Sequence, residues 1–329
     1  MVSGDSRNCG DVVMPAIARG AAANNASFYW HLGDFRAIYL TDQDYAQEHN
    51  PKQSMQQPST EYLASAWQDF IDNQLKPFGN LPVFLSFGNH EVIPPMTKPY
   101  AIAKFGYWLD RPEISLQRLK DDHSDETVKA YYHWQRDGID FISLDNSADK
   151  FGEDQLEWLQ AVLTLDREND KIRAVVVGMH EALPESISVG HSMSQTLLGE
   201  ETGIQVYRWL LEFKRQSKKS VYVLASHSHF YMPGIYDTEY WRKNGGVLPG
   251  WIVGTAGAER YALPDHSPRE AKTCVYGYMV ATVSAAEDDP VHFEFKELNE
   301  SDVPTEVVNR FGKEFVHACW VANPNTCTK

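Results

Sequence analysis

The feature that most constrains this chain is a series of short apolar runs, each followed at once by polar residues of the kinds that bind metal ions. Runs of this length are typical of buried strands, and helix-like stretches separate several of them. The runs with such polar ends are 28–32, 83–87, 174–178 and 221–225, with a very short one before Gly4-Asp5. Alternating strands and helices predict an α/β fold, in which parallel strands end together at one edge of a sheet.

The same periodicity predicts further elements. Apolar residues lie on one face of amphipathic helices at about 60–74 and 154–165, and a third helix is expected at 203–214. A β-hairpin is predicted around Asp137-Gly138, between the runs 131–134 and 139–144. Strands at 250–253, 276–283 and 291–295 complete the pattern.

Composition limits the classes of partner. The chain has 30 basic and 45 acidic residues, which gives a formal net charge of −15. An acidic surface argues against non-specific binding to nucleic acids or to anionic membranes. Because no apolar run approaches the length that spans a bilayer, we expect no membrane span.

The four cysteines contain no CxxC pair, so a zinc knuckle is not expected. We predict a disulfide between Cys319 and Cys327, because a staple would stabilise the short polar tail most. Cys9 and Cys274 are then the other intramolecular pair, and four reduced thiols are the alternative. A disulfide favours an oxidising compartment.

The N-terminus shows no signal peptide. Met1 is followed at once by Val2-Ser3-Gly4-Asp5, which reads as the end of a strand. We therefore expect a periplasmic or secreted protein whose leader is absent from this chain.

Strand ends carry six candidate metal ligands and one neighbouring histidine. Each piece alone is weak, since a Gly-Asp is usually a turn and a lone histidine is more often structural. Carboxylate, amide oxygen and imidazole together suit borderline divalent metals rather than calcium or soft copper. The ordered set predicts one site, where a carboxylate can bridge two ions about 3.5–4 Å apart. In chain order the residues are Asp5, Asp34, Asn89 with His90, His180, and His227 with His229.

These motifs resemble those of the calcineurin-like metallophosphoesterases, and most nearly the bacterial branch related to purple acid phosphatases. The likeness covers about 5–229, and the run Gln155-Leu156-Glu157-Trp158-Leu159 supports it. It implies two packed β-sheets flanked by helices, a four-layer sandwich with the site at the strand ends. It also implies hydrolysis of a phosphate ester, but it does not specify the substrate.

The resemblance further implies a role for each residue. Two divalent or trivalent transition metals, such as iron, zinc or manganese, would bind a hydroxide that attacks phosphorus. His90 would protonate the leaving group or stabilise its charge. The ligands would be Asp34 as the bridge, Asp5 and His229 on the first ion, and Asn89, His180 and His227 on the second.

The first motif departs from the family pattern. The family usually has Asp-x-His there, whereas this chain has Asp5-Ser6-Arg7. The tyrosine that purple acid phosphatases place three residues after the second aspartate is Ala37 here, and Tyr39 lies two residues further on. Arg7 is predicted either to clamp the substrate phosphate or to form a salt bridge on the rim. Arg36 is a second candidate for the clamp.

We therefore expect residues 1–329 to form one metallophosphoesterase domain that acts as a phosphomonoesterase on a small-molecule ester. A proline-rich insertion at about 94–130 is expected near the active site. The alternatives are a phosphodiesterase of cyclic nucleotides or lipid headgroups, and a degenerate protein that binds a metal or ligand without turnover. His191 and Glu181 are expected in a solvated loop. Packing is expected for His31 and for most of Trp108, Tyr131, Tyr132 and Trp134.

Overall fold

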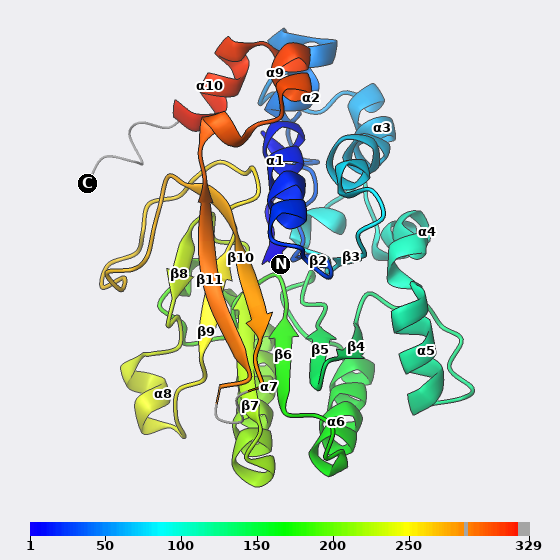
Figure 1. The fold of residues 1–329 in the computed structure, drawn as a ribbon, viewed down its shortest axis with the longest axis vertical. Helices are drawn as coiled ribbons and strands as arrows, with labels where there is room; N and C mark the ends of the chain where they lie inside the picture. Colours follow the sequence, from blue (N-terminus) through cyan, green and yellow to red (C-terminus); the bar gives the residue numbers. More distant parts are fainter. Residues whose placement is uncertain (286–288, 322–329) are drawn as a thin grey trace.

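The structure is a computed structural model and describes residues 1–285 and 289–321. Two β-sheets pack face to face, and helices cover the outer side of each sheet (Figure 1). This confirms the α/β fold with two packed sheets that the sequence predicts.

The first sheet carries strands from both ends of the chain: β1 (Val2–Ser3), β2 (Tyr29–His31), β3 (Val83–Leu85), β10 (Tyr276–Val283) and β11 (Val291–Leu298). Its order is β11-β10-β1-β2-β3. Strands β1, β2 and β3 are parallel, whereas β10 is antiparallel to β1 and to β11. The carboxyl ends of the three parallel strands therefore meet at one edge.

The second sheet consists of β4 (Tyr132–Arg136), β5 (Ile139–Ser143), β6 (Ala174–Gly178), β7 (Ser220–Ala225), β8 (Tyr231–Pro233) and β9 (Gly250–Val253). Its order is β4-β5-β6-β7-β9-β8, with antiparallel strands at both edges and parallel strands between them. The predicted hairpin is confirmed. Asp137 and Gly138 have φ values of 52° and 77°, the positive values that a two-residue type I′ turn requires.

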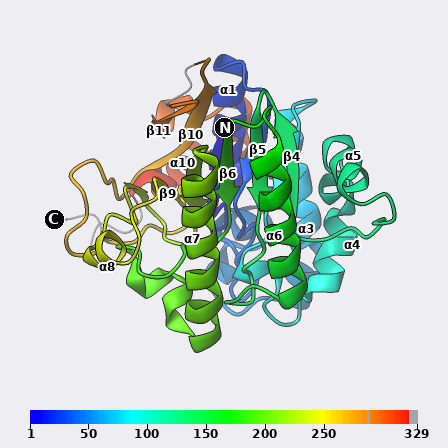
Figure 2. The same cartoon turned by 90° about the horizontal axis from the view of Figure 1, so that it is seen from below.

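Helices α1 (Gly10–Ala23) and α3 (Thr60–Phe70) lie outside the first sheet, and α6 (Glu153–Glu168) and α7 (Leu197–Ser217) lie side by side outside the second (Figure 2). The sequence did not indicate α1, because this helix is buried around most of its surface and has few polar residues. The segment expected as an insertion forms α4 and α5. The remaining helices are α2 (Gln43–His49), α4 (Lys98–Leu109), α5 (Pro112–Asp121), α8 (Glu239–Lys243), α9 (Thr305–Phe311) and α10 (Lys313–Val321).

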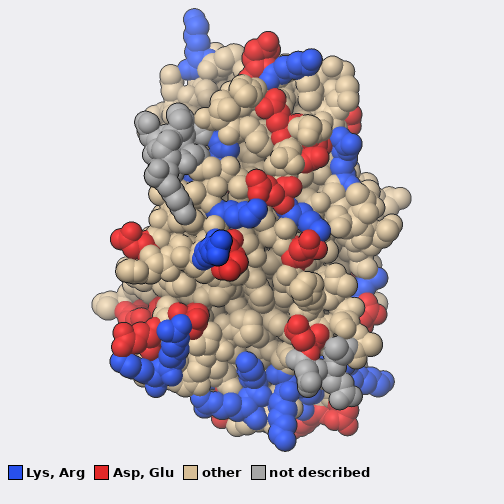
Figure 3. All heavy atoms as spheres, turned by 60° about the vertical axis from the view of Figure 1, so that its left-hand side comes forward, with Lys and Arg blue, Asp and Glu red and all other residues tan. Residues whose placement is uncertain are grey.

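Charged side chains are mixed on the surface. On the side seen in Figure 3, acidic and basic side chains lie interspersed, and residues of neither kind cover much of the area. The negative net charge is thus not gathered into one patch on this side. In the part of the chain that the structure describes, every helix is too short or too polar to cross a membrane.

Successive side chains along a strand point to opposite faces of the sheet, and this alternation separates two apolar clusters. In β6, Val175 and Val177 pack with the cluster under α6 and α7, whereas Val176 packs with the cluster that includes α1. Between the sheets, the ring of Trp134 stacks on Phe84 with centroids 3.9 Å apart. Because β6 is buried on both faces, its sequence is a continuous apolar run.

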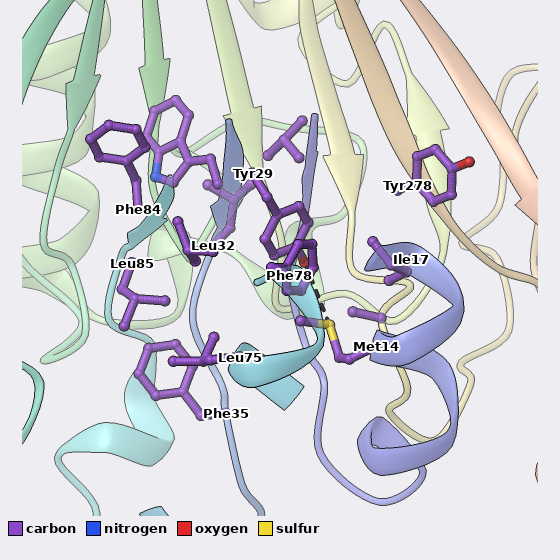
Figure 4. Packing of buried hydrophobic residues seen from close by; sticks show 14 of the residues in the cluster. Met14, Ile17, Tyr29, Leu32, Phe35, Leu75, Phe78, Phe84, Leu85 and Tyr278 are labelled. Carbon is purple, nitrogen blue, oxygen red and sulfur yellow. Dashed lines mark hydrogen bonds between the residues drawn. The ribbon is translucent and has the colours of Figure 1, made fainter. Parts of the chain in front are cut away.

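Helix α1 is fixed to the first sheet by close packing (Figure 4). Its Met14 and Ile17 lie near Tyr29 of β2 and Tyr278 of β10, and the Tyr29 hydroxyl donates to Met14 Sδ at 3.6 Å. This packing also holds the short segment between β1 and α1. That segment carries the first candidate ligand.

A disulfide joins Cys9, just before α1, to Cys319 in α10. The two residues are 310 positions apart, and their Cα atoms are 6.1 Å apart. The predicted pairings, Cys319–Cys327 and Cys9–Cys274, are therefore wrong, and Cys327 lies outside the described residues. Nearness in sequence favoured the neighbouring cysteines, whereas packing places α10 beside the start of α1.

Candidate metal centre

The predicted ligands come together where strands of both sheets end. The loops after β1, β2 and β3 bring the oxygen ligands, and those after β6 and β7 bring the imidazoles. The centre thus lies between the carboxyl ends of two sheets, where α/β folds commonly place their sites. The set consists of Asp5, Asp34 and Asn89 from the first sheet and of His180, His227 and His229 from the second.

Four of these residues have the spacing of ligands around one ion. His180 Nε2 lies 3.0 Å from His227 Nδ1, 3.2 Å from Asn89 Oδ1 and 3.3 Å from Asp34 Oδ1. Ligand atoms held about 2.0–2.2 Å from a metal are about 3.0–3.5 Å apart at tetrahedral or octahedral angles. Ligand atoms of Asp34, His180 and His227 lie close enough together to share a metal.

Backbone carbonyls orient two of the imidazoles. His180 Nδ1 lies 2.9 Å from the Leu32 carbonyl oxygen, and His229 Nδ1 contacts the Glu259 carbonyl. A carbonyl only accepts, so each Nδ1 carries a proton and each Nε2 is directed at the centre. Burial would lower the pKa of His180, but Asp34 and Asp5 outweigh it and raise it to about 10, so Nε2 of His180 also carries a proton that a metal would displace. A carbonyl partner of this kind is typical of metal-binding histidines.

Two carboxylate oxygens in the centre are buried without a hydrogen-bond partner in the described part of the chain: Asp5 Oδ1 and Asp34 Oδ2. Burial alone would raise the pKa of each carboxyl, but neighbouring histidines outweigh it and hold both below their usual range. Buried ionised oxygens are costly unless a cation or a donor compensates them. Together with the convergent imidazole nitrogens and the amide oxygen of Asn89, they fit a bound metal.

The backbone around the centre is strained. Asp5 and Asp34 both have φ of 60° and His227 has φ of 62°, the left-handed region that non-glycine residues rarely adopt. A Cβ on Gly88 would lie 2.3 Å from Asp34 Oδ1, and one on Gly33 would lie 2.4 Å from the Gly88 nitrogen. The motif glycines thus permit the close approach of two loops. Strain of this kind clusters at functional sites.

Glu91 holds these loops together, a role that sequence reasoning missed. Its carboxylate accepts from the backbone N–H groups of Asp34 and Phe35 at 2.9 Å each and from Gly88 at 2.7 Å. Burial and the nearby charge of Asp34 raise the pKa of Glu91 to about 8. Its place at the end of Gly88-Asn89-His90-Glu91 was the available signal.

His90 lies beside the carboxylate expected to bridge two ions. Its Nε2 is 3.4 Å from Asp34 Oδ2, and its Nδ1 is 2.5 Å from the Ala37 carbonyl, to which it donates. Burial lowers the pKa of His90 to about 4, so the imidazole is neutral in the free site. The ring therefore presents a lone pair toward the centre.

Arg7 lies inside the site and not on its rim. The residue is 5% exposed, and no carboxylate among the described residues forms an ion pair with it within 4.0 Å. Its guanidinium donates to the hydroxyls of Tyr39 at 3.0 Å and Tyr261 at 3.2 Å, and Nη2 lies 3.0 Å from His229 Nε2. Burial would lower the pKa of Arg7, but Asp34, Tyr261, Tyr39 and Asp5 together outweigh it and raise the pKa. The predicted rim salt bridge is wrong.

Arg36 does not face the centre. It is fully buried and donates to Asp11, to Asp69 and, at 2.8 Å, to Asp44. Its role as a second phosphate clamp is therefore excluded, because its guanidinium already pairs with these carboxylates.

The solvated loop expected after His180 is wrong for Glu181, whereas His191 is half-buried and follows the exposed residues Val189 and Gly190. Glu181 is 4% exposed, and His191 stacks on Tyr261 with centroids 4.9 Å apart and lies 5.5 Å from the ring of His227. Tyr261 also stacks on His229 at 4.0 Å. No motif surrounds Tyr261, so the sequence offered no signal for it.

The remaining aromatic residues behave as expected. Tyr132 and Trp134 are buried in the core, Tyr131 packs against Trp158, and His31 is fully buried with Nε2 2.9 Å from Ser6 Oγ. These side chains therefore serve packing rather than stacking of a substrate.

Known proteins share this fold at low sequence identity. No protein-family model and no curated protein matches the sequence. A purple acid phosphatase from yellow lupin (Lupinus luteus) seeds is similar in structure, with a TM-score of 0.57 and 15% identity over 90% of this chain and 50% of that chain. PhoD is similar with a TM-score of 0.50 and 13% identity, over 97% and 76%. The chain thus spans half the length of the lupin protein, and it has the metallophosphoesterase fold that the resemblance implies.

Proposed function

We propose that this chain is a metal-dependent hydrolase of phosphate esters that acts as a phosphomonoesterase on a small molecule. The observation that carries the proposal is the buried group of ligand atoms: two unpartnered carboxylate oxygens, and His180 Nε2 with an imidazole nitrogen, an amide oxygen and a carboxylate oxygen 3.0–3.3 Å from it. Such a group needs a cation to be stable away from water. The metallophosphoesterase fold, with its site at the strand ends, supports the same chemistry.

The donor set suits iron, zinc or manganese. Asn89, His180 and His227 would hold one ion together with Asp34. In the two-ion arrangement predicted from the sequence, Asp5 and His229 would hold the other. A bound ion of this kind makes hydroxide available near neutral pH and stabilises negative charge on the phosphoryl group.

Arg7 is proposed to contact the substrate phosphate. Its Nε is buried without a hydrogen-bond partner in the described part of the chain, so a donor is available for an anion. A guanidinium binds two phosphate oxygens at once, which favours the terminal, doubly charged phosphate of a monoester. His90, whose Nε2 lies 3.4 Å from Asp34 Oδ2, would face the leaving group.

The predicted insertion is proposed to border this site. Lys98 at the start of α4 contacts Asp145 at 2.6 Å. The next residue, Asn146, accepts from the backbone N–H of His180 at 3.2 Å. Helix α4 is thus connected to the loop that carries a candidate ligand.

A different function is binding without turnover. The contact between Arg7 and His229 Nε2 favours it, because it engages one predicted ligand. The discriminating experiment reconstitutes the purified protein with Mn²⁺, Zn²⁺ or Fe²⁺ and supplies p-nitrophenyl phosphate, an alkyl phosphate and bis-p-nitrophenyl phosphate. Faster monoester hydrolysis is the expected result. Metal binding without turnover supports the binding protein, and faster diester hydrolysis contradicts the monoesterase.

His90 can be tested separately. If it protonates the leaving group, His90→Ala should lower kcat about 10²–10⁴-fold for an alkyl ester and much less for an activated aryl ester. The aryl ester serves as the matched control because its leaving group departs without a proton. Equal losses with both esters would mean that His90 only holds the site in place.

We further propose that the protein works outside the cytoplasm. The Cys9–Cys319 disulfide supports this, since disulfides persist mainly in oxidising compartments. Isolation of native material under thiol-blocking conditions should yield the bonded form, and reduced Cys9 and Cys319 would contradict the proposal.

A further inference from the structure

The guanidinium of Arg7 lies against an atom that a first metal ion would need. Arg7 Nη2 is 3.0 Å from His229 Nε2. Since His229 Nδ1 donates to the Glu259 carbonyl, Nε2 has only its lone pair to offer. A guanidinium carries donors and no acceptor, so its N–H group engages that lone pair.

We propose that the Arg7 guanidinium takes the place of the first metal ion, so that the centre tightly binds one ion and not two. The single bound ion lies on the side of Asn89, His180 and His227. The inference rests on the proposed function for the nature of the site, but it changes the number of ions and the source of the second positive charge.

Arg7 is held in this position from several sides. It is 5% exposed, and the hydroxyls of Tyr39 and Tyr261 accept from it at 3.0 and 3.2 Å. The Tyr261 ring also stacks on His229, with centroids 4.0 Å apart and an angle of 20° between the planes. Displacing the guanidinium would break both hydrogen bonds and leave buried groups without partners.

The two halves of the centre differ in what they offer an ion. Around His180 Nε2, three acceptor atoms lie 3.0–3.3 Å away. On the other side, Asp5 Oδ1 and His229 Nε2 are 3.4 Å apart, and Arg7 already contacts the imidazole. Asp5 Oδ2 is engaged by the hydroxyl of Ser226 and the backbone N–H of His227.

Charge favours the same arrangement. Arg7 is always protonated, and a divalent ion between Asp5 and His229 would lie next to this positive charge in a buried site. One guanidinium and one divalent ion already offset the two carboxylates of Asp5 and Asp34. The guanidinium therefore offers the phosphate the positive charge that a first ion would supply.

The test counts ions directly. The wild-type chain and Arg7 variants are loaded with Mn²⁺, freed of excess metal by gel filtration and measured by elemental analysis and by electron paramagnetic resonance. Wild type should retain about one equivalent with the spectrum of an isolated ion. Arg7→His removes the charge and adds a ligand, so it should retain about two equivalents with a spin-coupled spectrum, as expected for ions about 3.5–4 Å apart.

Matched variants separate charge from packing. Arg7→Lys keeps the positive charge and Tyr39→Phe keeps the arginine, so both should retain about one equivalent. If Arg7→His does not fold, as judged by circular dichroism, Arg7→Gln replaces it and should gain a second, weaker equivalent that Arg7→Lys lacks. Equal stoichiometry in the Gln and Lys variants would contradict the inference.

The inference and the proposed function fail in different ways. Two coupled Mn²⁺ ions in wild type, with hydrolysis, would overturn the one-ion centre and leave the hydrolase standing. A wild-type chain that binds no metal and hydrolyses no ester would overturn both.

Discussion

Two Asp-x-Arg segments follow neighbouring strands of the same sheet, and their arginines lie in opposite surroundings. Arg7 follows Asp5 after β1, and Arg36 follows Asp34 after β2. Both aspartates have φ of 60°, so the local backbone is alike. Yet Arg7 faces the candidate metal centre, whereas Arg36 faces a cluster of carboxylates away from it.

The two buried groups also differ in how their carboxylates are satisfied. We define the Arg36 cluster as Arg36 with Asp11, Asp42, Asp44 and Asp69, and in the described part of the chain each of its carboxylate oxygens has a hydrogen-bond partner. In the metal centre, one oxygen of Asp5 and one of Asp34 have none. Buried carboxylates whose oxygens all have partners within the protein stabilise the fold. Buried carboxylates with an oxygen that lacks a partner indicate a site for a bound cation.

The sharpest test of this difference is Asp34→Asn. Loss of the open carboxylate should lower hydrolysis at least about a thousandfold, a barrier increase of about 4 kcal/mol, and deplete bound metal. The metal-free protein should stay folded, because a buried charge without a partner is removed. Elemental analysis, kinetics and urea unfolding measure these effects.

Asp11→Asn is the matched control, since Asp11 is equally buried but belongs to the Arg36 cluster. It should keep the metal and lose stability. Full metal content and activity in Asp34→Asn would show that this carboxylate binds no ion.

The arginines provide the next comparison. Arg36→Met leaves several buried carboxylates without their cation and should cost about 3–5 kcal/mol of unfolding free energy. Arg7→Met, in the metal-loaded protein, should cost about 1–2 kcal/mol, because its partners are neutral. Urea denaturation of both variants tests the ranking.

Inhibition by free phosphate should rank the two variants the other way, with the larger effect in Arg7→Met and the smaller in Arg36→Met. Arg7→Met should weaken it about tenfold or more, given about 1.5–3 kcal/mol for a charge-assisted bond. Wild-type phosphate affinity in Arg7→Met would disprove the clamp. Equal stability losses in the two arginine variants would remove the distinction between a structural and a functional arginine.

Glu91→Gln tests whether Glu91 holds the loop that carries the Asp34 carboxylate. The amide group offers one acceptor oxygen where the carboxylate accepts three backbone N–H groups, so the Asp34 loop should loosen. Metal affinity should fall about 10–100-fold, as for other residues that orient ligands, with the fold retained. Competition with a chelator measures the affinity.

Above about pH 8, where Glu91 is ionised, Glu157→Gln on the exposed face of α6 is the control for loss of one negative charge and should bind metal like wild type. An equal loss of affinity in both variants would point to general electrostatics instead of loop support.

The smallest expected effect is a pH dependence of stability within the Arg36 cluster. Burial, with Asp11 nearby, raises the pKa of Asp69 to about 7 despite Arg36. A carboxyl group whose pKa is higher in the folded than in the unfolded state stabilises the folded state while it is protonated. This contribution is complete below the unfolded pKa of about 4 and is lost as pH rises through the folded pKa of about 7. The unfolding free energy should therefore fall by about 1–2 kcal/mol between about pH 5.5 and about pH 7.

Asp69→Asn should flatten this dependence, because it imitates the protonated side chain. Asp72→Asn, an exposed carboxylate nearby, should leave it unchanged. Urea unfolding at several pH values measures how the unfolding free energy of each variant changes with pH. If Asp69→Asn shows the same pH dependence as wild type, the effect belongs to another group.

Much of the fold and the order of the candidate ligands followed from the sequence alone. Strands buried on both faces are continuous apolar runs, as at 174–178, and the motif residues stand directly after them. These signals are local, because strand periodicity and the spacing of Gly33-Asp34 or Gly88-Asn89 depend on a few adjacent residues. Parallel strand ends then meet at one edge whatever the details of the packing.

Only the tertiary structure decided which arginine faces the site, which cysteine pairs with Cys9, and which side chains complete the centre. Arg7 and Arg36 have the same local spacing, and packing of their loops against different layers separates them. Cys319 and Tyr261 reach the N-terminal segment across 310 and 254 positions of the chain, where no sequence pattern operates. Such contacts depend on how whole layers of the molecule pack, which local periodicity does not encode.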